Sequence, residues 1–179
     1  MTEVATLMPQ TKPAQLVTRV GTPDDLDELM ALSAMACEEN GFLNPNPEML
    51  LREIYPALCQ DHGIVGVVGP EGGPISGAVL LRISQTWYSA DPLIEERAIF
   101  VHPDVRKGKR SVQTKMPASY LIEFSKKVSD TLGIPLMIGV LSNHRTASKV
   151  RLYTRHFGEP AGAYFLYGAR TGNHSGTEH

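Results

Sequence analysis

The sequence predicts a mixed α/β domain with a mostly antiparallel sheet flanked by helices. The first observation is the order of its segments, which follow one another as strand, helix, helix, three strands, helix, strand, helix and strand. The second is the turn "PEGG" between two apolar segments, which is typical of a hairpin. The third is the apolar run "PLMIGVLS" between two helical segments, which predicts a buried strand reached by a crossover connection.

Composition and charge place the chain among single-domain globular proteins. Its 179 residues are 42% hydrophobic and 20% charged, and the net charge of −2 argues against a protein that binds polyanions over its whole surface. Cys37 and Cys59 indicate neither a disulfide framework nor a zinc site, and we expect no metal. The sequence shows neither a signal peptide nor an apolar run of the ~18 residues that cross a bilayer. We therefore expect a cytoplasmic protein.

The first strand and the first two helices follow from periodicity and end signals. "QLVTRV" alternates apolar and polar residues as a half-buried strand does. In "GTPDDLDELMALSAMACEENG", Thr22 suits the N-cap, Pro23 suits the first helical position, and Gly41 closes the helix. "NPEMLLREIYPALCQ" is a second helix, in which Pro56 predicts a kink or a split.

The remaining segments alternate strands with helices. "GIVGVVG", "PISGAVLLRIS" and "LIEERAIFV" read as strands, and "ASYLIEFSKKVSDTLG" has one apolar helical stripe that Gly133 ends. After the strand "PLMIGVLS", the segment "NHRTASKVRLYTRHFG" predicts a helix whose stripe includes Val150, Tyr153 and Phe157. "AGAYFLYG" predicts a last strand.

The two ends of the chain lack apolar periodicity. "MTEVATLMPQTKPA" has two prolines and no period, and "GARTGNHSGTEH" has nothing to bury. We therefore expect a flexible arm at residues 1–14, one domain at residues 15–168 and a disordered tail at residues 169–179.

A basic segment lies between the strand "RAIFV" and the helix that begins near Ala118. Residues 106–115 carry five positive charges. Because the first N–H groups of a helix lack intrahelical partners and the helix dipole is positive there, this arrangement favours an anion. One alternative is a solvated loop that binds nothing. The other is a contact with nucleic acid, which the net negative charge of the whole chain does not favour.

Segment order and residues together resemble the GNAT superfamily of acyl-CoA-dependent N-acyltransferases, over the whole expected domain. In that family a strand ending in Val-x-Pro leads into a loop of pattern [QR]-x-x-G-x-[GA] and a helix, and a later helix carries Leu-Tyr. Here "IFVHP" (99–103) matches the strand end, and Leu152-Tyr153 matches the dipeptide. "QTKMPA" (113–118) matches the loop, except that Met116 replaces the first glycine and an insertion precedes it. This departure is similar to that of divergent members encoded in phage genomes.

The resemblance implies acetyl-CoA as the co-substrate. Its diphosphate would dock on the amides that open the helix near Ala118, and a backbone amide of the preceding strand end would stabilise the oxyanion. Ser142 and Asn143 would bond the pantetheine arm, or one of them caps the next helix instead. The positions that the resemblance implies for the coenzyme are Ile99, Phe100, Val101, Gln113, Thr114, Lys115, Met116, Ala118 and Asn143.

The resemblance also implies that Tyr153 is the general acid that protonates the departing thiolate. A phenol with an ordinary pKa near ~10 is a weak acid for this step, so its catalytic effect depends on how its hydroxyl is positioned. The alternative is that Tyr153 fills a core position with Val150 and Phe157, which share its helical stripe.

The general base is sought on the strand "LIEERAIFV". Glu95 is the first candidate, because strict alternation places it on one face with Arg97, Ile99 and Val101. Glu96, which then faces the other way, is the fallback, and His102 is a third option. An ion pair at the surface is the alternative role for the glutamates.

The function that follows is transfer of an acetyl group from acetyl-CoA to a primary amine of a small molecule or protein by direct attack. The alternative is a module with a degraded loop, which binds acyl-CoA or a partner without turnover. Trp87 and Tyr88 line an acceptor cleft, a homodimer surface or the core. We expect no membrane partner and no nucleic acid.

Overall fold

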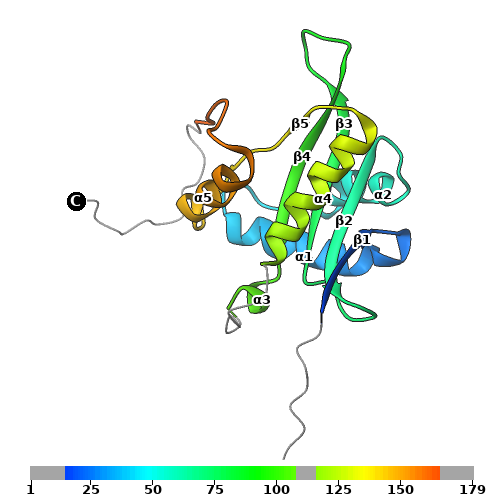
Figure 1. Cartoon of the computed structure of the whole chain (residues 1–179). Coiled ribbons are helices and arrows are strands. Elements are labelled where there is room, and N and C mark those ends of the chain that lie inside the picture. Colours follow the sequence, from blue (N-terminus) through cyan, green and yellow to red (C-terminus); the bar gives the residue numbers. More distant parts are fainter. Residues whose placement is uncertain (1–14, 108–115, 166–179) are drawn as a thin grey trace, which may run out of the picture.

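The computed structural model describes residues 15–107 and 116–165 (Figure 1). The predicted arm and most of the predicted tail therefore lie outside the described residues, as does the loop at 108–115. The elements, in chain order, are β1 (Leu16–Val20), the short 3-10 helix η1 (Pro23–Asp25), α1 (Leu26–Asn40), α2 (Pro47–Leu58), β2 (Gly63–Pro70), β3 (Gly77–Gln85), β4 (Pro92–Val101), α3 (Pro103–Lys107), α4 (Pro117–Leu132), β5 (Leu136–Met137) and α5 (Thr146–Phe157).

The strands form one sheet in the order β1-β2-β3-β4-β5. The pairs β1–β2, β2–β3 and β3–β4 are antiparallel, whereas β5 runs parallel to β4. This arrangement confirms the predicted mixed, mostly antiparallel sheet and the crossover that leads to its last strand. The β4–β5 ladder is short, because it ends after Ile94 pairs with Leu136 and Glu95 pairs with Met137.

Helices cover both faces of the sheet, with α4 on one face and α1 and α2 on the other (Figure 1). Neighbouring residues of a strand therefore serve two cores, as Val67 and Val68 of β2 do. The core under α1 and α2 contains Leu29, Leu32, Ile54, Ala57, Leu58, Val65, Val67 and Ala78. The core under α4 contains Val68, Val79, Leu81, Ile94 and Leu121.

The helix ends follow the signals in the sequence. The Thr22 amide donates to Asp25 Oδ2 over 2.8 Å at the entry to α1, which stabilises the N-terminal turn. Gly41 and Gly133 end α1 and α4 at φ angles of 68° and 66°, a region that glycine adopts at no steric cost. Pro56 lies inside α2, which continues to Leu58 as one helix and is not split.

Three segments differ from the sequence-based expectation. The start of the basic loop forms the short helix α3, and "PLMIGVLS" contributes only the two residues of β5 to the sheet. Residues 161–165, from the expected last strand, belong to no strand. The edge of the sheet explains this, because β5 ends at Met137 and offers no ladder for a further strand to join.

Cys37 and Cys59 are free thiols. No helix among the described residues combines the length and hydropathy that a membrane span requires.

Candidate functional site

The candidate site lies where β4 and β5 separate. Ile94 N donates to Pro135 O over 2.8 Å, so the two strands are still paired there. Two residues after β5 ends, Gly139 N instead donates to the side chain of Glu96, at 3.4 Å from Oε2. A carboxylate therefore occupies the place between the strands that a backbone carbonyl would fill in a continuous ladder.

A β-bulge decides which glutamate reaches this place. Leu81 of β3 pairs with Glu96, and Leu80 pairs with Ala98, so Arg97 has no partner on β3. The extra residue breaks the strict alternation used above, and Glu96 lies on the face of the sheet that carries α4. The expectation that Glu95 shares a face with Ile99 and Val101 is therefore wrong.

Glu95 instead faces α2, in a group of charged side chains. It lies 3.4 Å from Arg97 Nη1 and accepts from Ser84 Oγ at 3.4 Å. Glu53 of α2 completes the group, with Arg82 and Arg97 each 3.5 Å away. Arg97 thus joins both carboxylates, and this arrangement matches the alternative role of an ion pair at the surface.

Helix α5 brings Tyr153 to Glu96. The Tyr153 hydroxyl donates to Glu96 Oε2 at 3.4 Å, a long hydrogen bond of the kind that often shortens when substrate binds. The Tyr153 ring contacts Phe157 edge-on, with centroids 6.2 Å apart. Lys126 of α4 lies 4.8 Å above the Phe157 ring and donates to the carbonyl of His156, which anchors the end of α5.

The pair is tuned by burial. Burial raises the pKa of Glu96 to about 7, although bonds from Gly139 N, Tyr153 Oη and Ile99 N and the charge of Lys149 oppose the rise. Burial and the neighbouring carboxylate raise the pKa of Tyr153. Near neutral pH, Glu96 therefore exchanges a proton readily, while Tyr153 keeps its own.

A second polar group adjoins this pair at the C-terminal end of α1. Arg106 of α3 forms a bidentate ion pair with Glu39 of α1, with Nη1 donating to Oε1 over 2.8 Å. Arg106 thus faces α1, whereas the sequence reasoning placed it with the phosphate-binding basic residues. One turn before Tyr153, Lys149 donates to Ser142 Oγ over 2.5 Å.

Asn143 joins the same polar group. Its amide donates to Asn40 Oδ1 of α1 over 3.0 Å, so the chain after β5 is tied to the end of that helix. Thr146 opens α5 and donates to the Ser142 carbonyl. Asn143 therefore lies at the C-terminal end of α1, and its role with a coenzyme stays a prediction.

The other expected coenzyme residues divide between β4 and the start of α4. Ile99 and Val101 pack on the α4 side of the sheet, and Phe100 packs on the opposite side. Met116 is the N-cap of α4, with φ −66° and ψ 139°. Its carbonyl accepts from Ser119 N at 2.9 Å and from Tyr120 N at 3.4 Å. Pro117 has no N–H, so Ala118 supplies a first-turn amide for an anion. Gln113, Thr114 and Lys115 lie outside the described residues.

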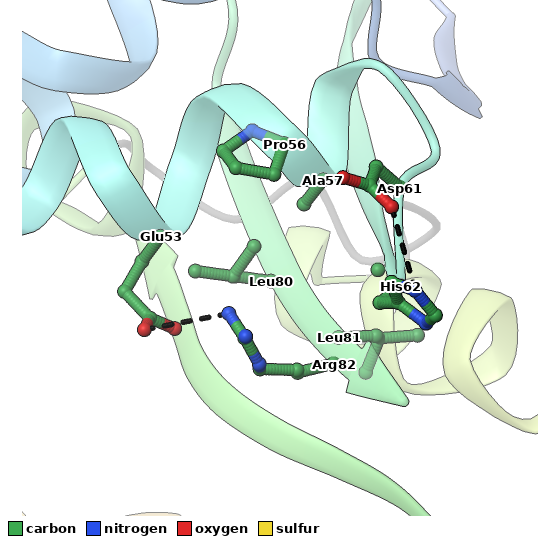
Figure 2. Close-up of a pocket in the computed structure, with 9 residues that line it drawn as sticks. Glu53, Pro56, Ala57, Asp61, His62, Leu80, Leu81 and Arg82 are labelled. Carbon is green, nitrogen blue, oxygen red and sulfur yellow. Dashed lines mark hydrogen bonds and ion pairs between the residues drawn. The ribbon is translucent and has the colours of Figure 1, made fainter. Parts of the chain in front are cut away.

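Two hollows lie away from this site. Figure 2 shows a crevice between α2 and β3, where Arg82 reaches Glu53 and Asp61 lies 3.6 Å from His62; it leaves no space for a water molecule. A groove of about 480 Å³ lies between α4 and the edge strand β1, across the sheet from β5. Neither contains Tyr153 or Glu96.

Trp87 and Tyr88 lie in the β3–β4 turn and are 96% and 73% exposed, which excludes the core and leaves an acceptor cleft or a dimer surface. Among the described residues, no group of three His, Cys, Asp or Glu side chains could hold a metal ion.

Sequence reasoning missed Lys149 and Glu39 and ranked Glu96 second. Lys149 carried a usable signal, because a residue four before Tyr153 on a helix lies on the same face. Glu39 carried none, since its contact with Arg106 joins segments 67 residues apart. The bulge at Arg97 had no mark such as a glycine or proline in the sequence.

Comparison with family models finds no match, and comparison with curated proteins finds none. Among solved structures, AAC(6')-Iy in complex with a bisubstrate analogue of CoA superposes with a TM-score of 0.63 at 18% identity, covering 88% of this chain and 99% of the other. A possible acetyltransferase from Clostridium difficile 630 gives 0.62 at 14% identity, with 85% and 96% covered.

The soil metagenomic aminoglycoside acetyltransferase meta-AAC0020, in complex with sisomicin, gives a TM-score of 0.58 at 19% identity, with 87% of this chain and 97% of the other covered. TM-scores of 0.58 to 0.63 indicate a shared fold, although identities of 14% to 19% are too low to show a common function. The chain has the fold of these acetyltransferases, which confirms the GNAT-like architecture expected from the sequence.

Proposed function

We propose that this chain is an N-acetyltransferase that moves an acetyl group from acetyl-CoA to a primary amine by direct attack. The observation that carries the proposal is the contact between Tyr153 Oη and Glu96 Oε2 at the point where β4 and β5 separate. A phenol and a carboxyl group with a pKa near neutrality are the acid and base that such a reaction needs.

The residues around the Glu96–Tyr153 pair suit a coenzyme with a diphosphate and an amide-containing arm. The first-turn amide of Ala118 and the positive end of the α4 dipole favour phosphate. Among the described residues, no strand covers the edge of β4 beyond Met137, and the Ile99 amide there donates to Glu96. When bound, acetyl-CoA would supply the thioester that the amine attacks.

Glu96 is the general base in this proposal, in place of Glu95. An ammonium group with a pKa near 10.4 gives its proton to an ordinary glutamate at a cost of about 8 kcal/mol. With the pKa of Glu96 raised to about 7, the mismatch falls to roughly 3 units, or about 5 kcal/mol. Burial of Glu96 thus removes a large part of the barrier to forming a neutral amine.

Tyr153 is the general acid. The nitrogen loses two protons in the overall reaction, and the thiolate that leaves gains one. Glu96 accepts the first proton and passes it to Tyr153 through their hydrogen bond as Tyr153 protonates the thiolate, because the raised pKa of Tyr153 disfavours a free phenolate. Glu96, ionised again, accepts the second proton from the nitrogen and releases it to water. The proton balance then closes with one proton on the thiol and one in the solvent.

The test is release of free thiol from acetyl-CoA in the presence of a panel of primary amines, with the melting temperature measured beside it. The expected result is a rise in melting temperature with acetyl-CoA and thiol release that depends on the amine. Met116 at the N-cap of α4 motivates the alternative of a binding module, which predicts the thermal shift without thiol release. If acetyl-CoA produces no thermal shift and no amine causes thiol release, the proposal is refuted.

A further inference from the structure

The end of α1 gathers hydrogen-bond donors that lack acceptors. Within the described residues, Arg106 Nε and Asn143 Nδ2 are buried and have no hydrogen-bond partner. Lys149 of α5 is half-buried near Arg106, and its ammonium group donates to Ser142 Oγ. Buried donors of this kind cost free energy unless an acceptor is supplied.

The chain's own carboxylate does not supply that acceptor. Glu39 is engaged in a bidentate pair by the Nη1 and Nη2 ends of Arg106, which leaves Nε on the outer edge of the guanidinium. The Asn40 side chain receives the Asn143 amide and donates to the Leu141 carbonyl. The acceptors of Glu39 and Asn40 are thus occupied, while Arg106 Nε and Asn143 Nδ2 have no acceptor.

Positive charge exceeds negative charge here. The cations are Arg106, Lys149 and Arg145. Glu39 is the carboxylate that faces them, and Glu96 of β4 has a smaller effect on Lys149. Burial, Arg106 and Arg145 lower the pKa of Lys149, against the pull of Glu39 and Glu96. An added anion would relieve the repulsion among these cations.

We propose that Lys149, Arg106 and Asn143 form a binding site for an anionic group, a carboxylate or phosphate, carried by the amine acceptor. This inference rests on the proposed function and names its substrate class: a primary amine that also bears an acid. Planar or tetrahedral oxyanions accept several hydrogen bonds at once, which suits donors from α3, from α5 and from the loop that precedes α5.

The path of α5 assigns the site to the acceptor and not to the coenzyme. The loop that leads into α5 contacts α1 through Asn143 and Asn40, whereas the end of α5 contacts α4 through His156 and Lys126. Helices α1 and α4 cover opposite faces of the sheet (Figure 1). The start of α4, suited to the diphosphate, and the donor cluster at the end of α1 therefore lie on opposite faces of the sheet.

The site also disfavours a polycationic acceptor. Sisomicin, the ligand of meta-AAC0020, carries several amines, and an excess of positive charge beside Glu96 would repel such a molecule. Turnover should therefore be higher with O-phosphoethanolamine than with ethanolamine, and with 4-aminobutyrate than with 1-butylamine, and lowest with sisomicin.

The first experiment measures binding of inorganic phosphate to the full chain by calorimetry, with and without saturating CoA. Lys149→Met and Asn143→Asp are expected to weaken phosphate binding at least about tenfold, because one removes the cation and the other installs a carboxylate among the donors. Lys127→Met, on the exposed face of α4, is the matched control and should bind phosphate as the wild type does. Circular dichroism confirms that each variant folds, and Asn143→Asp serves if Lys149→Met does not.

Phosphate binding that persists under saturating CoA and is lost in either variant supports the inference. Binding that CoA abolishes assigns the donors to the coenzyme and overturns it, as does no binding or equal turnover within the matched amine pairs. The two proposals fail separately. If thiol is released equally fast with acidic and non-acidic amines, the acetyltransferase proposal stands and the anion-site inference fails. If phosphate binds but no amine causes thiol release, the anion-binding donors are confirmed and the acetyltransferase proposal is refuted.

Discussion

Replacing Glu96 by glutamine separates the chemistry of this side chain from its effect on stability. Burial raises the pKa of Glu96 from 4.5 to about 7, so ionisation is less favourable in the folded protein by ~2.5 units, or about 3 kcal/mol. Glutamine keeps the acceptor oxygen for Tyr153 and Gly139 but carries no charge. It therefore removes the base and the cost of a buried carboxylate together.

The stability consequence has a definite sign. Below pH 4.5 the carboxyl group is protonated in both the folded and the unfolded chain and contributes nothing. Between pH 4.5 and about 7 the unfolded chain releases its proton first, so the free energy of unfolding falls as the pH rises. Above pH 7 the full cost of about 3 kcal/mol applies. Glu96→Gln should therefore match the wild type near pH 4 and exceed it by up to about 3 kcal/mol near pH 8, measured by urea denaturation.

The kinetic consequence runs the opposite way. A general base acts when deprotonated, so kcat/KM of the wild type should rise with pH through about 7 and then level. Glu96→Gln should lose about 10²-fold or more in rate and lose that pH dependence. Glu95→Gln is the matched control, because its carboxylate faces α2. Two results together would refute the reasoning. Glu95→Gln would be inactive, and Glu96→Gln would be active and no more stable than the wild type at pH 8.

Three further substitutions test the site and its support. Tyr153→Phe should lower kcat about tenfold to 10²-fold while the acetyl-CoA thermal shift persists, and an unchanged kcat would remove its role as acid. Leu121→Ala, at a fully buried position under α4, should cost about 2–5 kcal/mol of unfolding free energy, measured by urea denaturation, and a smaller loss would contradict the packing of α4 on the sheet. Gly66→Ala should cost about 1–3 kcal/mol in the same measurement, because its Cβ would lie 2.4 Å from Phe124 Cδ1; a neutral result would show that α4 shifts easily.

Local sequence signals were sufficient for most of the fold. Gly41 and Gly133 end their helices in the left-handed conformation that their place after an apolar stripe predicts. The hairpin around "PEGG" and the antiparallel strands follow from turn chemistry and apolar patterning. These features depend on neighbours in the sequence, which is why a single sequence reveals them.

The site was predicted less well because it depends on contacts between distant segments. Tyr153 could be singled out by the resemblance, but its partner depends on one unpaired residue, Arg97, that shifts the facing of every β4 residue around it. The donors at the end of α1 come from segments that meet only through the crossover and α5. A one-residue bulge and a long-range contact leave no periodic trace, so only three-dimensional coordinates show them.

The bulge bears on whether the chain is an enzyme or a binding module. It places Glu96 on the same face of the sheet as Ile99 and Val101, near the end of β5, where the carboxylate has no ion pair among the described residues. A module that only binds acyl-CoA would gain about 3 kcal/mol at pH 8 from glutamine at this position and keep both hydrogen bonds. Glu96 is destabilising at pH 8, but with a pKa near neutrality it can accept a proton in catalysis, which gives the carboxylate a function. If Glu96→Gln proves more stable and binds acetyl-CoA as well as the wild type, neither stability nor coenzyme binding accounts for the carboxylate. Turnover is then the property that the carboxylate serves.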